Sequence, residues 1–331
     1  MPTSYNDLIG VVEPAFAETI SARLDAIEVR LAEQARGDNP FVSQVAGHVV
    51  AAGGKRFRPL LVALAASLGD GADPSRVERA AVVVELTHVA SLYHDDVMDE
   101  AQLRRGADSV NARWGNSVAI LVGDLLFARA SSVVTTLGLE FVELQARTFA
   151  RLVHGQVAET IGPGESDDPL EHYLAVVADK TGSLIATSAV FGGMVAGLDD
   201  ASLAALGRFG EAIGTVFQLS DDLIDIASNT SGKTPGTDLR AKVPTLPTLY
   251  VRRSTHPADA RLLALLDGDL SDDADLAEAL RLLRAHPAMD DARAEISRRA
   301  ELARSYLGPL PVGQARDALS ALCDAVIDRS A

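Results

Sequence analysis

Nearly every patterned segment of this chain has the residue spacing of an α-helix, and this feature limits the possible folds more than any other. Alanine and leucine dominate, aromatic residues make up only 5% of the 331 residues, and the alternation that marks β-strands is hard to find. No repeat, low-complexity tract or long linker divides the chain. The sequence therefore predicts an all-α fold in which residues 1–331 form a single domain, a bundle of about ten or more helices.

Helix-start and helix-stop residues place the expected elements. Asp73 and Pro74 begin a helix that leads into residue 99, and glycines follow the two helices before it. Helices are expected at 5–35, 41–52, 74–99, 117–137, 140–160, 169–179, 183–197, 201–227, 245–253, 271–285, 288–305 and 313–329. Two polar loops, 101–109 and 228–245, each follow an Asp-rich helix end, and such loops are often functional.

Acidic side chains outnumber basic ones by 46 to 30, which gives a formal net charge of −16 at pH 7. Such a surface repels phosphate backbones and anionic lipids, which argues against a nucleic-acid partner. The single cysteine, Cys323, cannot form an internal disulfide and favours a reducing compartment. The start of the chain lacks a signal-peptide pattern, and the longest uncharged stretch, 181–198, is too short for a membrane span. We therefore expect a cytoplasmic protein without a membrane span.

Two pentads of the form D-D-x-x-D occur at 95–99 and 221–225. In a helix the first and last Asp of each pentad lie one turn apart on one face, and like charges at that spacing are destabilising. A divalent cation removes this penalty, and carboxylates without soft ligands favour Mg²⁺. The alternative, a solvated acidic face, better suits the other Asp pairs, which lie beside loop residues. The candidate metal ligands are Asp95, Asp96, Asp99, Asp221, Asp222 and Asp225.

Basic residues gather near the first pentad. GGKRFRP at 53–59 places cations after a glycine turn, RRG follows the pentad at 104–106, and His88 lies two helical turns before Asp95 on the same face. Each feature alone has an ordinary explanation, as a surface turn or a core histidine. Together with the pentad they indicate a site where phosphate meets both metal and arginine.

A third group of polar residues surrounds the second pentad. Residues 180–182, Lys-Thr-Gly, are expected to open the uncharged helix and to hold an anion at its N-terminus. Gln218 lies on the same face as the pentad, and Lys233 and Lys242 lie in the loop beyond it. A lysine in a loop is usually only solvated, so these two lysines indicate little by themselves.

In order and spacing, the segments GGKRFRP, ELTHVASLYHDDVMDEAQLRRG, DKTGSL and FQLSDDLIDI resemble the trans-isoprenyl (polyprenyl) diphosphate synthase family. The resemblance covers residues 44–250. It implies a helical bundle around a central cavity, with the two Asp-rich helices facing each other across its mouth. It also implies a prenyltransferase that condenses isopentenyl diphosphate with an allylic prenyl diphosphate, and a homodimer.

The resemblance also assigns roles to individual residues. The six Asp residues of the pentads would hold about three Mg²⁺ on the allylic diphosphate. Contacts with that diphosphate are implied for Arg104, Lys180, Thr181, Gln218 and Lys233. Contacts with isopentenyl diphosphate are implied for Gly54, Lys55, Arg58, His88 and Arg105. The candidate catalytic residues are Asp95, Asp99, Arg104, Lys180 and Asp221.

The implied reaction agrees with the residues present. Breaking an allylic C–O bond produces a carbocation and a diphosphate, and metal ions and cations stabilise the departing charge. No protein nucleophile is needed, and the chain has no Ser/His/Asp or Cys/His pattern. One departure concerns the loop after the second pentad, where Lys242 replaces a glycine usual in the family and Val243 replaces a lysine. We therefore leave Lys242 out of the site.

Small residues precede the first pentad at the positions that limit product length in this family. Ala90 and Ser91 stand where members with short products carry an aromatic residue, so a geranylgeranyl or longer product is expected. Two other readings remain open: a class I terpene cyclase, and a non-catalytic subunit of a two-component prenyl synthase. The residues of the isopentenyl pocket argue against the first, and the two intact pentads argue against the second.

Overall fold

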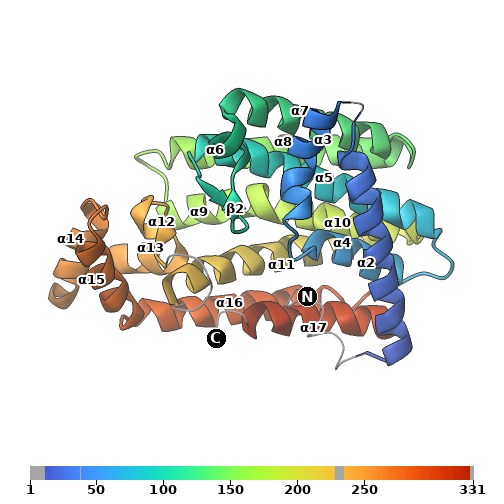
Figure 1. Ribbon diagram of the computed structural model, residues 1–331. Coiled ribbons are helices and arrows are strands. Elements are labelled where there is room, and N and C mark those ends of the chain that lie inside the picture. Colours follow the sequence, from blue (N-terminus) through green and yellow to red (C-terminus); the bar gives the residue numbers. More distant parts are fainter. Residues whose placement is uncertain (1–11, 38, 228–234, 329–331) are drawn as a thin grey trace. The chain divides into compact units, whose positions relative to one another are not determined.

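The computed structural model describes residues 12–37, 39–227 and 235–328, and almost all of their regular structure is helical (Figure 1). The expected all-α fold is confirmed. The described chain divides into two compact units. The first unit comprises the described residues up to 150 together with 184–210 and 306–322, and the second comprises 151–183, 211–305 and 323–328. A single domain over 1–331 stays a prediction.

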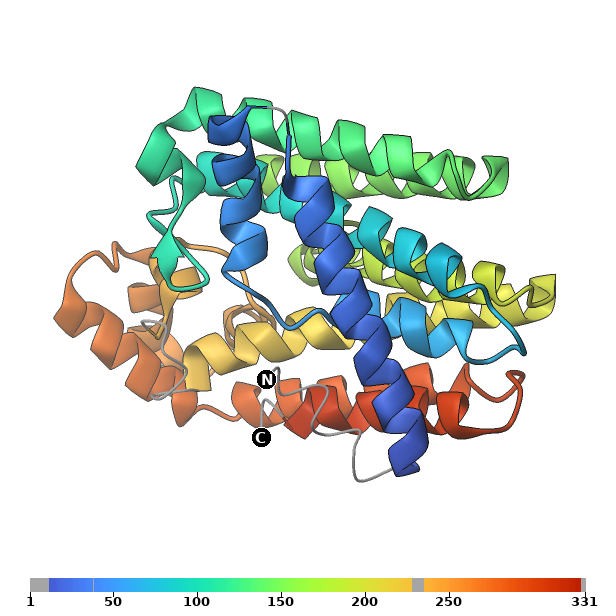
Figure 2. The same ribbon diagram turned by 45° about the vertical axis from the view of Figure 1, so that its right-hand side comes forward.

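The first unit is built around the long helix α5. Asp73 caps α5 by accepting a hydrogen bond from the Ser75 N–H, and Pro74 occupies the first helical position. α5 packs most extensively against α7 and also against α2 and α4, as Figure 2 shows for α2. Because it is surrounded, α5 is apolar on nearly every side before it reaches the first pentad. The helices are α2 (Pro14–Ala35), α3 (Pro40–Ala51), α4 (Phe57–Ala66), α5 (Pro74–Met98), α6 (Val110–Trp114) and α7 (Asn116–Val134).

A short β-hairpin occupies the expected loop 101–109. Strands β1 (Leu103–Arg104) and β2 (Ala107–Asp108) are antiparallel, with Arg104 opposite Ala107. The two turn residues, Arg105 and Gly106, have φ values of 54° and 79°. Positive φ at both positions gives a tight turn that matches the twist of the strands. The hairpin therefore holds both arginines at fixed positions after α5.

The second unit contains α9 (Pro169–Val177) and the short π-helical turn η1 (Ala178–Gly182). α13 packs against α9 and α16, and α14 packs against α15 (Figure 1). The remaining elements of this unit are α12 (Thr237–Arg240), α13 (Leu246–Arg252), η2 (Pro257–Asp259), α14 (Ala260–Asp267), α15 (Asp273–Arg284) and α16 (Ala288–Ser305). Four helices contribute residues to both units: α8 (Leu139–Ile161), α10 (Ser183–Val195), α11 (Asp200–Ala227) and α17 (Gln314–Asp328).

The structure corrects several expected helix boundaries. The opening helix begins at Pro14, because proline favours the first helical position; residues 5–11 lie outside the described part. α4, α6, α12 and α14 were not expected, and α12 lies within the expected loop 228–245. Nine of the ten α4 residues are buried, so its apolar pattern shows no helical periodicity. The expected break between 179 and 183 is wrong, since Pro169–Val195 is helical throughout.

Two helical segments in the described chain are long and apolar enough to pass a composition test for membrane spans, Asn116–Val134 and Pro169–Val195. Core helices of globular proteins pass the same test, and 56% of the window in the second segment is buried in the protein. The expectation of no membrane span is not contradicted.

Candidate active site

The first pentad occupies the C-terminal turn of α5. Asp95 is partly exposed and Asp99 is exposed at the helix end, whereas Asp96 is fully buried. The Asp96 Oδ1 accepts hydrogen bonds from Arg104 Nε at 2.7 Å and Nη2 at 2.5 Å. Burial raises the pKa of Asp96, and the Arg104 guanidinium opposes this rise. The structure thus brings Arg104 to the pentad, as expected, but places Asp96 in the protein interior.

Arg105, the next hairpin residue, is held by the end of α3. Its Nη1 donates hydrogen bonds to the carbonyl oxygens of Val49, at 3.1 Å, and Gly53. These carbonyls lie at a helix C-terminus, where a cation is favoured. A Cβ on Gly54 would lie 2.9 Å from Arg105 Cζ, so only glycine allows the turn to approach the guanidinium this closely. The structure therefore brings Gly54 and Arg105 together, as the sequence predicted.

Arg58 and His88 lie in the same basic cluster of the first unit. Arg58 Nε is buried and has no hydrogen-bond partner among the described residues, and burial lowers the pKa of Arg58 to about 10. The pKa of His88 lies well below 6.5, first because of burial and then because of nearby arginines, led by Arg58 and Arg105. His88 is therefore neutral at pH 7. Lys55 is exposed on the adjoining turn.

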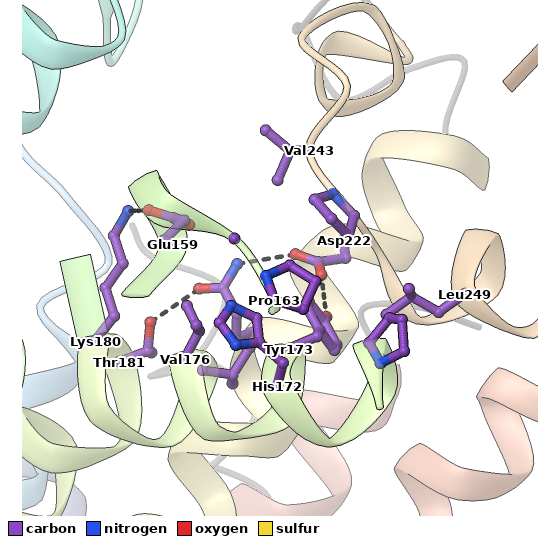
Figure 3. Close-up of a pocket in the computed structure, with 15 residues that line it drawn as sticks. Glu159, Pro163, His172, Tyr173, Val176, Lys180, Thr181, Asp222, Val243 and Leu249 are labelled. Atoms are coloured by element: carbon purple, nitrogen blue, oxygen red, sulfur yellow. Dashed lines mark hydrogen bonds and ion pairs between the residues drawn. The ribbon is translucent and has the colours of Figure 1, made fainter. Parts of the chain in front are cut away.

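The second pentad lies near the end of α11. A chain of hydrogen bonds leads to it: Thr181 Oγ1 donates to Gln218 Oε1 at 3.1 Å, and Gln218 Nε2 donates to Asp222 Oδ1 at 2.8 Å (Figure 3). The Tyr173 hydroxyl donates to the other oxygen of Asp222. Burial raises the pKa of Asp222 to about 7, although both hydrogen bonds oppose this rise. The arrangement joins Thr181, Gln218 and the pentad, as predicted.

Asp221 and Asp225 are both partly exposed, unlike Asp222. Asp225 Oδ2 accepts a hydrogen bond from the Asp238 N–H at 3.2 Å, and the Asp225 carbonyl accepts one from the Gly236 N–H. Residues 236–238 therefore lie beside the second pentad. In both pentads the second Asp is buried and the first Asp is accessible to solvent, because adjacent residues of a helix point about 100° apart.

A pocket of about 170 Å³, partly open to solvent, adjoins this hydrogen-bond chain in the second unit (Figure 3). Its lining is mostly apolar, with side chains such as Val176 and Leu249, and includes polar groups such as Gln218, Asp222 and Thr181. Lys180 Nζ forms an ion pair with Glu159 Oε2 at 2.5 Å at its edge. An apolar pocket with a few polar groups on one wall suits a ligand that has a hydrocarbon part and a charged part.

The expectation that residues 180–182 open a helix is wrong. η1 continues α9 into α10, so the amide groups of Lys180 and Thr181 are not at a helix N-terminus that could bind an anion. A Cβ on Gly155 of α8 would lie 2.7 Å from the Lys180 backbone nitrogen, which shows how closely α8 approaches this turn. π-helical turns of this kind occur often at functional sites. The predicted contact of Lys180 with an anion therefore depends on its side chain alone.

Lys242 adopts a φ of 57°, the left-handed conformation that favours glycine. This conformation explains why the glycine that is usual in the resembling family suits the position of Lys242. The Lys242 side chain is exposed and lies near Asp269, whose pKa is lowered first by hydrogen bonds from Ser271 and then also by the Lys242 charge. Val243 lines the pocket instead. Leaving Lys242 out of the site agrees with this geometry, and Lys233 lies outside the described residues.

Sequence reasoning missed three residues that organise the two groups. Arg56, Glu85 and Tyr173 are all buried and all bond to charged partners. Glu85 interrupts an otherwise apolar helix face, which is the signal that could have identified it.

Among the described residues, no group of three or more His, Cys, Asp or Glu side chains is arranged to hold a metal ion.

The comparisons identify the family. The family model described as polyprenyl synthetase matches residues 39–283. The chain is 48% identical over 319 residues to a nonaprenyl diphosphate synthase of Mycobacterium tuberculosis, covering 96% of this chain and 95% of the relative. It is 40% identical to a dimethylallyltranstransferase of the same organism, over 96% of this chain and 98% of the relative.

A crystal structure of geranylgeranyl pyrophosphate synthase from Corynebacterium glutamicum, complexed with calcium and isoprenyl diphosphate, has the same fold. Its TM-score is 0.86 and its identity 42%, over 96% of this chain and 98% of that one. These matches extend over almost the whole chain and include both pentads. The chain therefore belongs to the polyprenyl synthetase family and is a prenyltransferase.

Proposed function

We propose that this prenyltransferase extends an allylic prenyl diphosphate with isopentenyl diphosphate, using Mg²⁺ held by the two pentads, and that its product is geranylgeranyl diphosphate or longer. One observation carries the proposal. Each pentad is accompanied within its own unit by groups whose chemistry suits phosphate: Arg104 and Arg105 for the first, and Lys180 with Thr181 for the second. A purely structural acidic face needs neither set.

The donor chemistry of the pentads fits Mg²⁺. All the donors are carboxylate oxygens, and the first Asp of each pentad is accessible to solvent. Asp95 and Asp99 would be ligands from the first pentad, and Asp221 and Asp225 from the second. We propose that the buried Asp96 and Asp222 reach the metal site chiefly through the groups they hold, Arg104 and Gln218. When bound, Mg²⁺ supplies charge stabilisation for the departing diphosphate.

The basic cluster of the first unit would bind isopentenyl diphosphate. Arg105 is fixed by two backbone carbonyls, and the unpartnered Arg58 Nε gives an anionic ligand a buried donor. Because His88 is neutral, it would donate a hydrogen bond rather than supply a charge. Lys55 would add a cation from the exposed turn. Arg104, Lys180, Thr181, Gln218 and Lys233 are proposed for the allylic diphosphate.

We further propose a homodimer located in the cytoplasm. α7 exposes Ile120 and Leu121, which are 43% and 67% accessible, and α8 exposes Val157 and Ile161. Large apolar side chains on a helix surface indicate an interface with a protein partner. Family resemblance favours a second copy of this chain as that partner.

The deciding experiment is to incubate the purified protein with Mg²⁺, isopentenyl diphosphate and farnesyl diphosphate, and to measure product length by chromatography. We expect prenyl diphosphates of 20 carbons or longer, lost on chelation of the metal. Asp95→Ala should reduce turnover by at least about 100-fold, because it removes a metal ligand. Near-normal turnover in that variant would refute the metal assignment, and hydrocarbon formed without isopentenyl diphosphate would indicate a cyclase.

A further inference from the structure

Arg56 is the cation of the GGKRFRP turn that sequence reasoning did not assign, and it is the best-anchored one. Its relative exposure is 9%, and its guanidinium binds three partners. Nη1 donates to Glu85 Oε1 at 2.8 Å, Nη2 donates to Glu28 Oε2 and to the Val50 carbonyl, both at 2.9 Å, and Nε donates to Glu28 Oε1. Glu28 thus forms a forked pair with Arg56, the strongest geometry for such a contact.

The backbone at Arg56 needs this anchoring. Its φ of 47° and ψ of 34° lie in the left-handed region, which costs a residue with a side chain about 1 kcal/mol or more. The conformation joins the Gly53-Gly54 turn to the first turn of α4. Two carboxylates, from α2 and α5, therefore hold the turn in a conformation that it would not keep by itself.

The same turn fixes the other cations of the cluster. Arg56 and Arg105 both donate to carbonyls at the end of α3, Arg56 to Val50 and Arg105 to Val49 and Gly53. Lys55 and Arg58 are within two residues of Arg56. A shift of the Arg56 guanidinium therefore moves the groups that define the proposed isopentenyl diphosphate site.

We infer that Glu28 and Glu85, acting through Arg56, are positioning residues for the isopentenyl diphosphate site, and that Glu28 ties helix α2 to that site. The inference rests on the proposed function of this cluster. Neither glutamate touches substrate. Their effect is to hold Arg105, Lys55 and Arg58 at the separations that a diphosphate requires.

Glu28→Gln is the informative variant, because the Glu28 side chain is 43% exposed and its loss leaves Arg56 paired with Glu85. Removing Glu85 or Arg56 instead would leave a buried charge unpaired and endanger folding. We expect Glu28→Gln to raise the KM for isopentenyl diphosphate about five- to tenfold, while kcat and the KM for farnesyl diphosphate stay within about twofold. Arg56→Lys should act in the same direction, because an ammonium cannot bind all three partners. Because both substitutions act through the same contacts, the double variant should raise the KM for isopentenyl diphosphate no further than the more strongly affected single variant does.

The chain offers a matched control. Arg30 on α2 pairs with Glu78 on α5 at 2.8 Å, so Glu78→Gln breaks an ion pair between the same helices without touching the turn. Glu78→Gln should leave both KM values unchanged. Equal changes in Glu28→Gln and Glu78→Gln would overturn the inference, since the effect would then be general loosening of the two helices.

Arg58→Gln separates this inference from the proposed function. If Arg58→Gln does not raise the KM for isopentenyl diphosphate, the proposed function of the cluster is wrong. If it does, and Glu28→Gln behaves like the parent, the binding site stands and the positioning role of Glu28 is refuted.

Discussion

At the scale of the residue, two cations share a left-handed backbone and have opposite roles. Arg56 is buried and fixed by two glutamates, whereas Lys242 is exposed and lies near Asp269. A pattern of basic residues in the sequence does not distinguish them. What separates them is the supply of carboxylate partners, the buried Glu85 and the half-exposed Glu28, which come from helices far away in the chain.

The neutral state of His88 has a consequence for stability. Its pKa in the folded protein lies well below 6.5, so the unfolded chain binds the proton first and stability is lost as pH falls through about 6.5. His88→Gln removes this pH-dependent contribution to the free energy of unfolding. We expect the free energy of unfolding of the variant, relative to the parent, to rise by up to about 1 kcal/mol per pH unit as pH falls from 7.5 to 5.5, and the Tm difference to rise with it. Calorimetry without substrates measures it, and a constant Tm difference would contradict it.

Ala90 is the residue that we expect to limit product length. It is fully buried on α5, and its carbonyl lies 3.4 Å from the place of a Cβ on Gly123 of α7. Ala90→Phe adds a ring five residues before Asp95, and should shorten the product by one or more isoprene units. Chromatography of the products tests this. An unchanged product length in a stable variant would mean that Ala90 serves only helix packing.

At the scale of the element, the sequence predicted the long helices well and the short ones poorly. α5 carries a cap, a first-turn proline and a long apolar run, all of which agree locally. Apart from Arg58, α4 is apolar on every side, and the hairpin at Leu103–Asp108 has only two residues per strand, so neither offers a period to detect. The π-turn was missed because Gly182 resembles a helix stop. The turn packs against Gly155 of α8, and a local sequence pattern cannot reveal such a tertiary contact.

Close approach of α8 to the π-turn predicts a sharp contrast between two glycines. Gly155→Ala would place a Cβ 2.7 Å from the Lys180 backbone nitrogen and should cost about 1–3 kcal/mol of unfolding free energy. It should also raise the KM for the allylic substrate, because Lys180 moves. Gly47→Ala in α3 meets nothing within 4 Å and should be neutral or stabilising. Denaturant unfolding compares them; equal stability of the two variants would refute the close packing.

At the scale of the whole molecule, the net charge of −16 and the proposed anionic substrates are compatible because charge is organised locally. Arg56, Arg58 and Arg105 gather around the buried Glu85 in one unit, while many acidic residues lie at exposed helix ends such as Asp272 and Asp273. The pentads were singled out as candidate metal ligands from their spacing alone. The burial of Asp96 and Asp222 could not be predicted, because it depends on which neighbours cover each helix face.

The proposed dimer can be tested on α7. Leu121→Glu places a charge on a side chain that is 67% exposed, so it should not disturb the fold of the protomer, but it should disrupt an apolar interface. Light scattering should give about twice 34.8 kDa for the parent and the protomer mass for the variant. Val29→Glu on α2, 61% exposed, is the control and should keep the dimer mass. A dimer in both variants would exclude this face of α7.

The π-helical turn η1 also limits where residues can be inserted into this chain or deleted from it. Such a turn holds one residue more than an α-helical turn, so deleting a residue between Ala178 and Gly182 would restore regular winding. A five-residue π-turn and a four-residue α-turn both close about one full turn, so α10 would keep its orientation relative to α9. The side chains within the turn would change direction instead, and Thr181 would lose Gln218 while Lys180 would lose Glu159. Insertions and deletions should therefore be tolerated in the loop before Pro169 long before they are tolerated here.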